Sequence, residues 1–360
     1  MIKKKLDIIL RKRKSIRFSE FMNILLFDND HGVYEKDNLF GDSGHFITAP
    51  LASKYFSWCI ARNYEDVSKV TPSVDIVEFG AGSAVLAADL IKYLSVKSKL
   101  PKKYFIFEKS KNLIKAQRSL LEENNIMDII DVVWITDFKE LPSSAFIICN
   151  EFFDCIPTDL VKYDNNEFHI AHIDNNYQLI WEKYLFKEEG LCRFLNIPEQ
   201  LPDNYIFEFS KEQSIIVNKI SENIDRGYFL IFDYGYSSNE LYLKERNMGT
   251  ITCIKNHIYD FNPLDDLGNK DISSFVNFSY LDKLLKNNNW ITLGFMSQCN
   301  YLLSQGILED ADSNNISEMA AIKKLIMPNQ MGEIFKVLVL KKNIEDMTES
   351  KFLRNDLSKL

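Results

Sequence analysis

The sequence has few of the residues on which disulfide-stapled and metal-bound proteins depend. Its 360 residues include only six cysteines and five histidines, and the cysteines form no CxxC pair. A disulfide framework or a zinc site therefore has little support, and we expect no bound metal. The pair His169 and His172 does not change this, because a spacing of three places two residues on opposite faces of a strand.

Long apolar runs and two common catalytic motifs are also missing. The longest apolar runs, such as residues 145–149, are far shorter than the roughly 18 residues that a transmembrane helix requires. We therefore expect no stable insertion into a membrane. The chain contains neither GxxxxGK[ST] nor GxSxG, which excludes a P-loop and leaves a serine hydrolase without support.

Positive charge is scarce outside the N-terminus. The chain has 43 Lys and Arg against 51 Asp and Glu, a net charge of −8, although residues 1–17 contain eight Lys and Arg and only one acid. An acidic body argues against broad binding to a phosphate backbone, so nucleic acid is not an expected partner. The N-terminal apolar and basic positions recur at helical spacing, which favours an ordinary first helix over a targeting segment or a membrane-surface helix. These positions are Ile2, Leu6, Ile9, Arg13 and Ile16.

What the chain does contain is the pattern of a globular α/β protein, with 46% hydrophobic and 26% charged residues. From residue 74 onward, short apolar runs alternate with helix-like segments, as in a parallel sheet that is covered on both faces. The pattern predicts a Rossmann-like core of about seven strands. The expected strands are 74–79, 104–107, 132–135, 145–149, 228–232, 290–295 and 334–340. The expected helices include 85–94, 113–121 and 278–285.

The remaining segments predict additions to this core. Residues 1–70 are mostly helical in pattern, with a loop near residues 28–50. Polar and apolar residues alternate around two Asp-Asn-Asn turns, at Asp164 and Asp174, which predicts a small β-hairpin insertion. The expected parts are an N-terminal helical segment 1–70, a first core half 71–157, the hairpin insertion 158–205, a second core half 206–345 with an irregular insertion 234–275, and a polar tail 346–360.

The strongest local motif is a strand that ends in an acid and runs into a glycine turn. Glu78 precedes Phe79, and Gly80, Ala81 and Gly82 follow. Such a turn lets backbone approach a ligand, and the helix after it offers unpaired N–H groups, which predicts a nucleotide-like cofactor. A glycine turn of this kind also occurs as a connection between a strand and a helix where no ligand binds.

Two carboxylates narrow the choice of cofactor. Glu78 would repel a pyrophosphate but can pair with the ammonium group of S-adenosylmethionine (SAM), which favours SAM over NAD. Glu108 ends the next strand, where a carboxylate grips a ribose diol. Dinucleotide folds use the same device, so Glu108 does not distinguish the two cofactors.

Polar residues also follow the fourth expected strand. Asn150, Glu151 and Asp154 should face the reactive end of the cofactor, because open α/β sheets bind ligands beyond the carboxyl ends of their strands. Acids at that place would hold a cationic substrate. A helix N-cap followed by a proline turn is the alternative interpretation of Asp154.

The chain resembles the MidA-like family of class I SAM-dependent methyltransferases, which includes the mitochondrial arginine methyltransferase needed for complex I assembly. The likeness spans roughly residues 15–340. The segments that carry it are Phe18-Ser19-Glu20-Phe21-Met22, His31-Gly32-Val33-Tyr34, Gly44-His45-Phe46-Ile47-Thr48-Ala49-Pro50, Val77-Glu78-Phe79-Gly80-Ala81-Gly82, Asn150-Glu151-Phe152-Phe153-Asp154, Asp233-Tyr234-Gly235 and Asp271-Ile272-Ser273-Ser274-Phe275-Val276-Asn277-Phe278.

The resemblance implies SAM in the cleft and a protein arginine as substrate. Glu151 and Asp154 would clamp the guanidinium, with Glu208 as a weaker third acid. The loop that carries Thr48 would close over the cofactor, with Asp137 as a further cofactor contact. His257 matches a family histidine near the cleft, with a structural role equally open.

Three positions depart from the family pattern. His45 and Leu51 stand where the family has acids, and Ala84 stands where it has a third glycine. Ala84 is expected only to tighten helix packing. Because two acids are missing, two consequences stay open: a different substrate, or a loss of catalysis.

The predicted activity is therefore SAM-dependent methylation of arginine in a protein substrate, with a respiratory complex I subunit as one target. A non-catalytic SAM-binding assembly factor and, more weakly, an NAD-dependent dehydrogenase are the alternatives. The expected location is the cytoplasm of a bacterium, or the mitochondrial matrix in a eukaryote. The sequence contains no sign of the oligomeric state.

Overall fold

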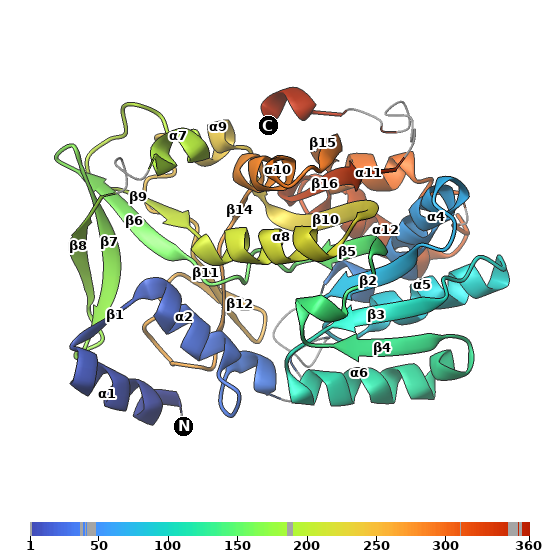
Figure 1. The fold of residues 1–360 in the computed structure, drawn as a ribbon, viewed down its shortest axis with the longest axis horizontal. Helices are drawn as coiled ribbons and strands as arrows, with labels where there is room; N and C mark the ends of the chain where they lie inside the picture. The colour runs from blue at the N-terminus through green and yellow to red at the C-terminus, as the bar shows by residue number, and fades with distance from the viewer. Residues whose placement is uncertain are drawn as a thin grey trace.

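A central mixed sheet dominates the computed structural model, which describes residues 2–36, 39, 41, 48–185, 190–309, 311–344, 352 and 355–360. The strand order is β15-β16-β10-β5-β2-β3-β4, and the short strand β14 pairs with β10 (Figure 1). The strands from β10 to β4 run parallel, whereas β16 is antiparallel to both of its neighbours. This is the predicted Rossmann-like α/β core.

The predicted strands of this core are confirmed to within a few residues. The largest difference is the strand predicted at 228–232, which is longer at both ends. Its extension reaches Tyr236 and carries Asp233 and Tyr234 beyond the end of β5, while both residues still pair with β16. The observed strands are β2 (Asp75–Phe79), β3 (Lys103–Phe107), β4 (Asp131–Ile135), β5 (Ser144–Asn150), β10 (Arg226–Tyr236), β14 (Val276–Asn277), β15 (Ile291–Ser297) and β16 (Phe335–Lys342).

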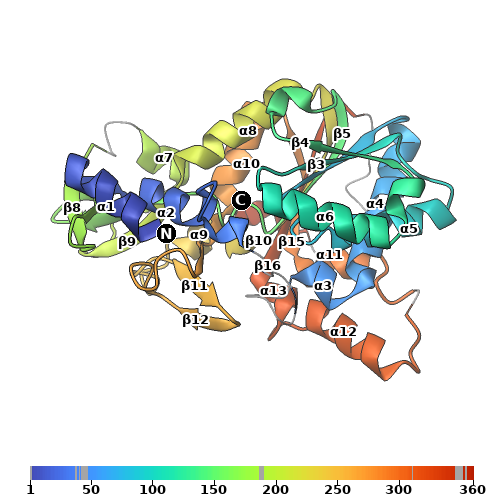
Figure 2. The same ribbon diagram turned by 90° about the horizontal axis from the view of Figure 1, so that it is seen from below.

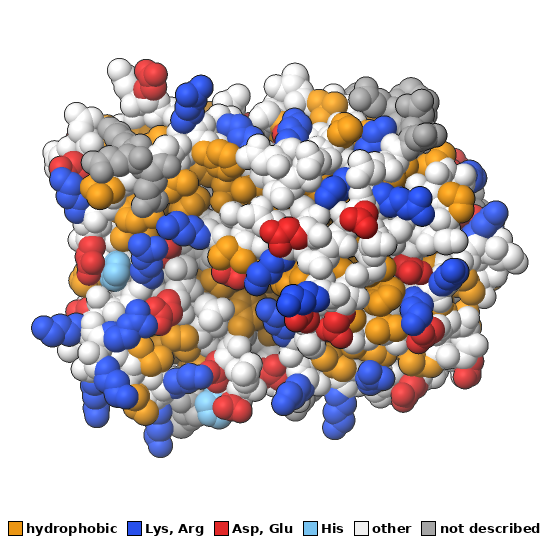
Figure 3. All heavy atoms as spheres, in the orientation of Figure 1, with side chains coloured by type: hydrophobic (Ala, Val, Ile, Leu, Met, Phe, Trp, Pro, Cys, Tyr) orange, Lys and Arg blue, Asp and Glu red, His pale blue; other side chains and the backbone are white. Residues whose placement is uncertain are grey.

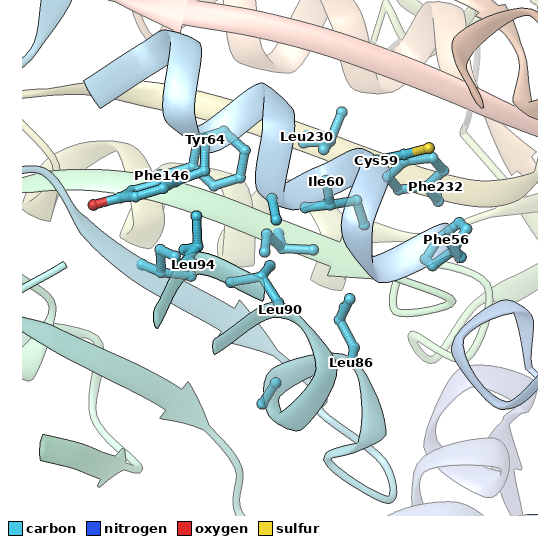
Figure 4. Packing of buried hydrophobic residues seen from close by; sticks show 14 of the residues in the cluster. Phe56, Cys59, Ile60, Tyr64, Leu86, Leu90, Leu94, Phe146, Leu230 and Phe232 are labelled. Carbon is cyan, nitrogen blue, oxygen red and sulfur yellow. The ribbon is translucent and has the colours of Figure 1, made fainter. Parts of the chain in front are cut away.

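Helices cover both faces of the central sheet. On one face, α4 and α5 present apolar residues every four positions, such as Phe56 with Ile60 and Leu86 with Leu90, to the sheet around Phe146 (Figure 4). Burying each such side chain stabilises the fold by about 1.5–3 kcal/mol. Helices α8 and α10 cover the other face. The helices of this core are α4 (Lys54–Val70), α5 (Val85–Val96), α6 (Lys111–Glu123), α8 (Lys211–Asn223), α10 (Phe278–Asn287), α11 (Gln298–Ser304), α12 (Ile316–Ile326) and α13 (Met331–Ile334).

A second sheet lies beside the core and contains the predicted hairpin insertion. The two hairpins turn at the predicted Asp-Asn-Asn segments. The sheet is larger than predicted, because it also takes in β1 from the N-terminus and β9. We therefore propose that the insertion ends at Phe209 rather than at residue 205. Its strands are β1 (Ser15–Arg17), β6 (Asp159–Asp164), β7 (Glu167–Asp174), β8 (Leu179–Tyr184) and β9 (Tyr205–Phe209).

The N-terminal residues form the predicted helix, α1 (Ile2–Arg13), which buries Ile2, Leu6 and Leu10. Lys and Arg side chains gather over it at the lower left of Figure 3. The inclusion of Ile16 in this helix was wrong, since Ile16 lies in β1 opposite Ile173. No described helix is both long and apolar enough to cross a membrane. The further short elements are α2 (Phe18–Phe27), α3 (Ala49–Ala52), α7 (Leu191–Leu195), α9 (Ser238–Leu241) and the 3₁₀ turns η1 (Val33–Glu35), η2 (Ile126–Asp128), η3 (Phe138–Glu140) and η5 (Leu357–Lys359).

A third sheet occupies the segment 234–275, where an irregular insertion was predicted. Its strands β11 (Thr252–Lys255), β12 (Ile258–Asp260) and β13 (Asp271–Ser273) pair antiparallel in the order β12-β11-β13. Asn256 and His257 form the turn between β11 and β12, both with positive φ. A two-residue turn of this kind usually contains glycine. Because this turn has none, the sequence did not predict the hairpin. Figure 2 shows β11 and β12 lying below the second sheet and α2.

Candidate functional site

A cavity of about 300 Å³ lies beyond the carboxyl ends of β2, β3 and β5. Its walls come from the central sheet, α2, α8 and the third sheet, and Figure 3 shows a hollow near the middle of this face. Ligands of open α/β sheets bind at this edge. Of the predicted site residues, all but two line the cavity. Those that do are Thr48, Glu78, Gly80, Ala81, Gly82, Glu108, Asn150, Glu151 and Asp154.

The glycine turn exposes bare backbone to the cavity. Gly80 and Gly82 have φ of 65° and 52°, the left-handed region that glycine adopts without steric cost. A Cβ added at Gly80 would lie 3.1 Å from the ring of Phe152, so a side chain there would need that ring to move. Ala84 also has a positive φ, 63°, just before α5 begins. The prediction that Ala84 only tightens helix packing is therefore incomplete, since it also holds a conformation that suits glycine.

Glu78 is a buried acid on the wall of the cavity. The Tyr104 hydroxyl donates a hydrogen bond of 2.7 Å to its Oε2 atom. Burial raises the pKa of Glu78 to about 7, against the smaller lowering effect of this hydrogen bond. A cationic ligand group beside Glu78 would favour its ionised form and would itself be held by it.

Glu108 is a carboxylate with a fixed orientation. Its Oε1 atom accepts hydrogen bonds from the N–H groups of Lys109 (2.8 Å) and Ser110 (2.9 Å). Its Oε2 atom accepts a longer one, 3.3 Å, from Gln117. Burial raises the pKa of Glu108, and the hydrogen bonds oppose this rise. The carboxylate is thus held in place before any ligand arrives.

Glu151 and Asp154 lie together at the same cavity, on the turn that follows β5. Glu151 adopts a φ of 52°, an uncommon backbone conformation that is often found at functional sites. Its carboxylate accepts hydrogen bonds from Tyr234 Oη (3.1 Å) and Asn150 Nδ2 (3.2 Å). The buried Oδ1 atom of Asp154 has no hydrogen-bond partner among the described residues. A buried acceptor atom without a partner indicates a place where a bound ligand can donate a hydrogen bond.

Two further acids, Asp233 and Asp271, join this cluster and were not assigned from the sequence. Asp233 lies on β10, one residue beyond the last residue paired with β5, and its Oδ2 atom accepts hydrogen bonds from the N–H groups of Phe153 (2.8 Å) and Asp154 (3.3 Å). Asp271 begins β13, lines the cavity and accepts a hydrogen bond of 2.9 Å from Tyr34 Oη. Both residues lie in segments that carried the family resemblance. The sequence analysis did not predict strand β13, and without that strand nothing placed Asp271 beside the cavity.

Burial and mutual repulsion raise the pKa values of this acidic cluster. The pKa of Glu151 rises to about 7 and that of Asp271 to about 6, in both cases mainly through burial. For Asp154 burial is again the largest cause of a raised pKa, followed by the charges of Asp233 and Glu151. Without a cation the cluster is therefore costly to ionise.

The remaining predicted residues lie elsewhere. Glu208 does not line the cavity. Instead it accepts backbone N–H groups of Thr250 and Ile251 and so fixes the chain that leads into β11. Asp137 caps the turn η3 by accepting the N–H of Lys139, and its neighbour Phe138 lines the cavity in its place. Neither carboxylate is among the described residues that line the cavity, so we carry neither residue into the proposed site.

Three other predicted features also need comment. His257 is exposed at the turn of the third sheet and does not line the cavity. Leu51 lies in α3 and is not among the described residues that line the cavity. His45, together with Phe46 and Ile47 of the predicted closing loop, lies outside the described residues.

The raised pKa values predict how stability depends on pH. Between the ordinary glutamate pKa of about 4.5 and the value of about 7 in the folded chain, the native state binds more protons than the unfolded state at Glu78 and Glu151. The free energy of unfolding should therefore fall as pH rises through this range. We expect ligand-free protein to melt about 5 °C lower at pH 8 than at pH 5.

Differential scanning calorimetry across this range tests the prediction. The acids with a lowered pKa do not offset the fall, because their effect lies below about pH 5. They are Asp28, Glu167, Asp260, Asp266 and Glu318. In a Glu151→Gln variant the fall should be smaller, because one of the buried acids with a raised pKa is gone. A melting temperature that rises from pH 5 to pH 8 would contradict this account.

Comparisons with known proteins extend over most of the chain. The model of a family of S-adenosyl-L-methionine-dependent methyltransferases matches residues 57–296. The protein arginine methyltransferase NDUFAF7, mitochondrial, of Xenopus laevis is 24% identical over 89% of this chain and 80% of its own length. The human protein of that name is 22% identical over 90% and 80%. A crystal structure of a Burkholderia thailandensis protein with S-adenosyl-homocysteine bound has a TM-score of 0.88 and 25% identity, and covers 97% of this chain and 94% of that one.

Proposed function

The chain belongs to this family of S-adenosyl-L-methionine-dependent methyltransferases, and from that premise we propose that it methylates arginine in a protein substrate. The observation that carries the proposal is the cluster of Glu151, Asp154 and Asp271 on the wall of the cofactor cavity. Three acids so close together are suited to a delocalised cation such as a guanidinium. The names of the curated relatives support the same substrate.

The residues of the cavity fit the cofactor. S-adenosyl-L-methionine, when bound, supplies a methyl group on a positively charged sulfur. The bare backbone of Gly80 and Gly82 offers close approach, and the buried Asn150 Oδ1 atom has no hydrogen-bond partner among the described residues. We propose that Glu78 pairs with the cofactor's ammonium group and that Glu108 binds its ribose hydroxyls. Thr48 is the remaining proposed contact, on the side where α3 begins.

Glu151 and Asp154 hold the substrate in this proposal. A carboxylate can accept two parallel N–H bonds from one guanidinium, which fixes the plane of the group as well as its position. Hydrogen bonds from Tyr234 and Asn150 already orient the Glu151 carboxylate, so the side chain loses little conformational freedom when the substrate binds. Alignment of this kind accounts for much of the rate of a displacement reaction.

The nitrogen that gains a methyl group must lose a proton. Asp154 Oδ1 is the proposed acceptor, because it is buried and makes no hydrogen bond with any described residue. Burial, and after it the neighbouring carboxylates, raises the pKa of Asp154, which increases its affinity for that proton. Asp271 and its Tyr34 partner close the same side of the cavity.

Methyl transfer from radiolabelled S-adenosyl-L-methionine into a cell lysate tests the proposal. We expect a labelled protein band, and methylarginine after its acid hydrolysis. Label on another residue would overturn arginine as the substrate while leaving the methyltransferase intact. No label, despite cofactor binding measured by calorimetry, would favour the alternative of a non-catalytic assembly factor. The protein arginine, a complex I target and the cellular compartment all remain proposals, although the curated relatives are named as mitochondrial.

A further inference from the structure

One face of the third sheet continues the wall of the cavity outward. Ile254 on β11 lies directly opposite Asp271 on β13 and opposite Tyr259 on β12. Directly opposed residues of antiparallel strands project to the same face of a sheet. Ile254 and Asp271 line the cavity, and so does Ser273, which shares their face. Tyr259 is therefore the next residue on that face, one strand beyond the described cavity wall.

Tyr259 also lies near the acidic cluster. Burial is the largest cause of the raised pKa of Tyr234, followed by the charges of Glu151 and Asp154, and Tyr259 contributes to the same rise. Because neighbouring strands lie about 4.8 Å apart, Tyr259 is about 10 Å across the sheet from Asp271. Tyr234 is also the hydrogen-bond donor to Glu151. An aromatic side chain on the outer strand is thus close to the proposed binding place of the guanidinium.

The outer strand of this hairpin and the residue that follows it are unusually apolar for a protein surface. Ile258, Tyr259 and Phe261 are 70%, 64% and 78% exposed. Isolated exposed apolar residues are common, but three large ones within four positions indicate a surface that contacts something else. Alternation along β12 places Ile258 on the face opposite to Tyr259. Only Tyr259 of this strand therefore shares the face that lines the cavity.

The hairpin is held firmly at its base. Cys253 is buried, and its strand β11 pairs with both neighbours. Lys270 bridges to Asp260 at 2.7 Å, and Lys255 forms an ion pair with Asp266. The exposed aromatic ring therefore projects from an ordered support, which lowers the entropic cost of binding a partner there.

We propose that Tyr259 binds the polypeptide segment that carries the target arginine, by packing against an apolar side chain next to that arginine. The occupant follows from the arrangement of charge and apolar surface. The acids inside the cavity suit the guanidinium, and the exposed ring outside suits a hydrophobic neighbour in the same chain. The inference rests on the proposed function for the arginine, and it adds a preference for the flanking sequence.

Peptide binding to protein saturated with S-adenosyl-homocysteine tests this without catalysis. The probes are three fluorescent, end-blocked peptides with the centres Leu-Arg-Leu, Gly-Arg-Gly and Leu-Gln-Leu, measured by fluorescence polarisation. The wild-type protein should bind the first at least fivefold more tightly than the second. Tyr259→Ala should reduce that ratio below twofold, and Tyr259→Phe should retain most of it. Ile258→Ala is the matched control, equally exposed but on the other face, and should keep the wild-type ratio.

The outcomes separate this inference from the proposed function. Equal affinity of the wild type for the two arginine peptides, or an unchanged ratio in Tyr259→Ala, overturns the role of Tyr259. Equal affinity for the Leu-Arg-Leu and Leu-Gln-Leu peptides instead overturns arginine as the substrate, even if the effect of Tyr259 persists. Calorimetric binding of S-adenosyl-homocysteine to each variant confirms that the variant is folded.

Discussion

Glu151→Gln should lower methyl transfer to arginine by about a thousandfold, or roughly 4 kcal/mol of transition-state stabilisation. The substitution keeps the size of the side chain and an oxygen that can accept the Tyr234 hydrogen bond, but it removes the charge that pairs with the guanidinium. Steady-state rates at saturating cofactor measure the effect. Calorimetry should show that affinity for S-adenosyl-homocysteine changes less than threefold, because Glu151 is proposed to hold the substrate.

Tyr234→Phe is the matched control for this result. It leaves the Glu151 carboxylate in place and removes only the hydrogen bond of 3.1 Å that orients it. We expect a loss of about tenfold, because orientation is weakened and the charge remains. If Glu151→Gln turned over as fast as the wild type, Glu151 would have no part in the mechanism.

Glu78→Gln should weaken binding of S-adenosyl-L-methionine by about a hundredfold. The amide retains the hydrogen bond from Tyr104 and the shape of the buried site, but it cannot attract the ammonium group. A buried ion pair that loses one charge leaves the other uncompensated, at a cost of about 3 kcal/mol. Isothermal titration calorimetry with S-adenosyl-L-methionine and with S-adenosyl-homocysteine measures the change, which should be similar for both because both carry the ammonium.

Tyr104→Phe separates charge from local hydrogen bonding at this place. It removes the donor at 2.7 Å from Glu78 and keeps the carboxylate. Affinity should fall less than fivefold, since the ammonium can replace the lost donor. A variant with Gln at position 78 that still bound the cofactor at wild-type strength would show that the acid does not select it.

The central sheet was predictable because its strands are buried on both faces. Segments such as 145–149 are continuous apolar runs, and burial on both faces is the usual reason for such a run. Helices α4 and α5 likewise repeat apolar residues every three or four positions. The glycine turn and the acids of the Asn150-Glu151 segment lie at strand ends, so the sheet edge alone brought them into one cavity.

The third sheet was not predictable by the same reasoning. Its strands are only three or four residues long, which is too short for a periodicity to be recognised. The turn at Asn256 and His257 lacks glycine, so the residues of the turn did not predict a hairpin. Asp271 is placed by the register between β11 and β13, and no pattern along the chain reveals a register between segments more than ten residues apart. Tyr259 is placed by the hairpin of β11 and β12, which the sequence did not predict.

Glu208 is predicted from the sequence as a weaker third acid of the substrate site, whereas the structure pairs its carboxylate with main chain. An acid in an apolar strand attracts a functional interpretation, since burying a carboxylate requires compensation. Here the compensation is the main chain of Thr250 and Ile251 rather than a ligand. From sequence alone, the two kinds of compensation look the same.

The pairing of β1 with β7 has a consequence for how the chain is made. Ile16 meets Ile173 only after more than 150 further residues have left the ribosome. The amino-terminal segment must therefore wait, with part of its apolar surface uncovered, while the nascent polypeptide lengthens. Such distant contacts form slowly, so we expect the second sheet to be the last part of the molecule to mature, with chaperones attending the early intermediates.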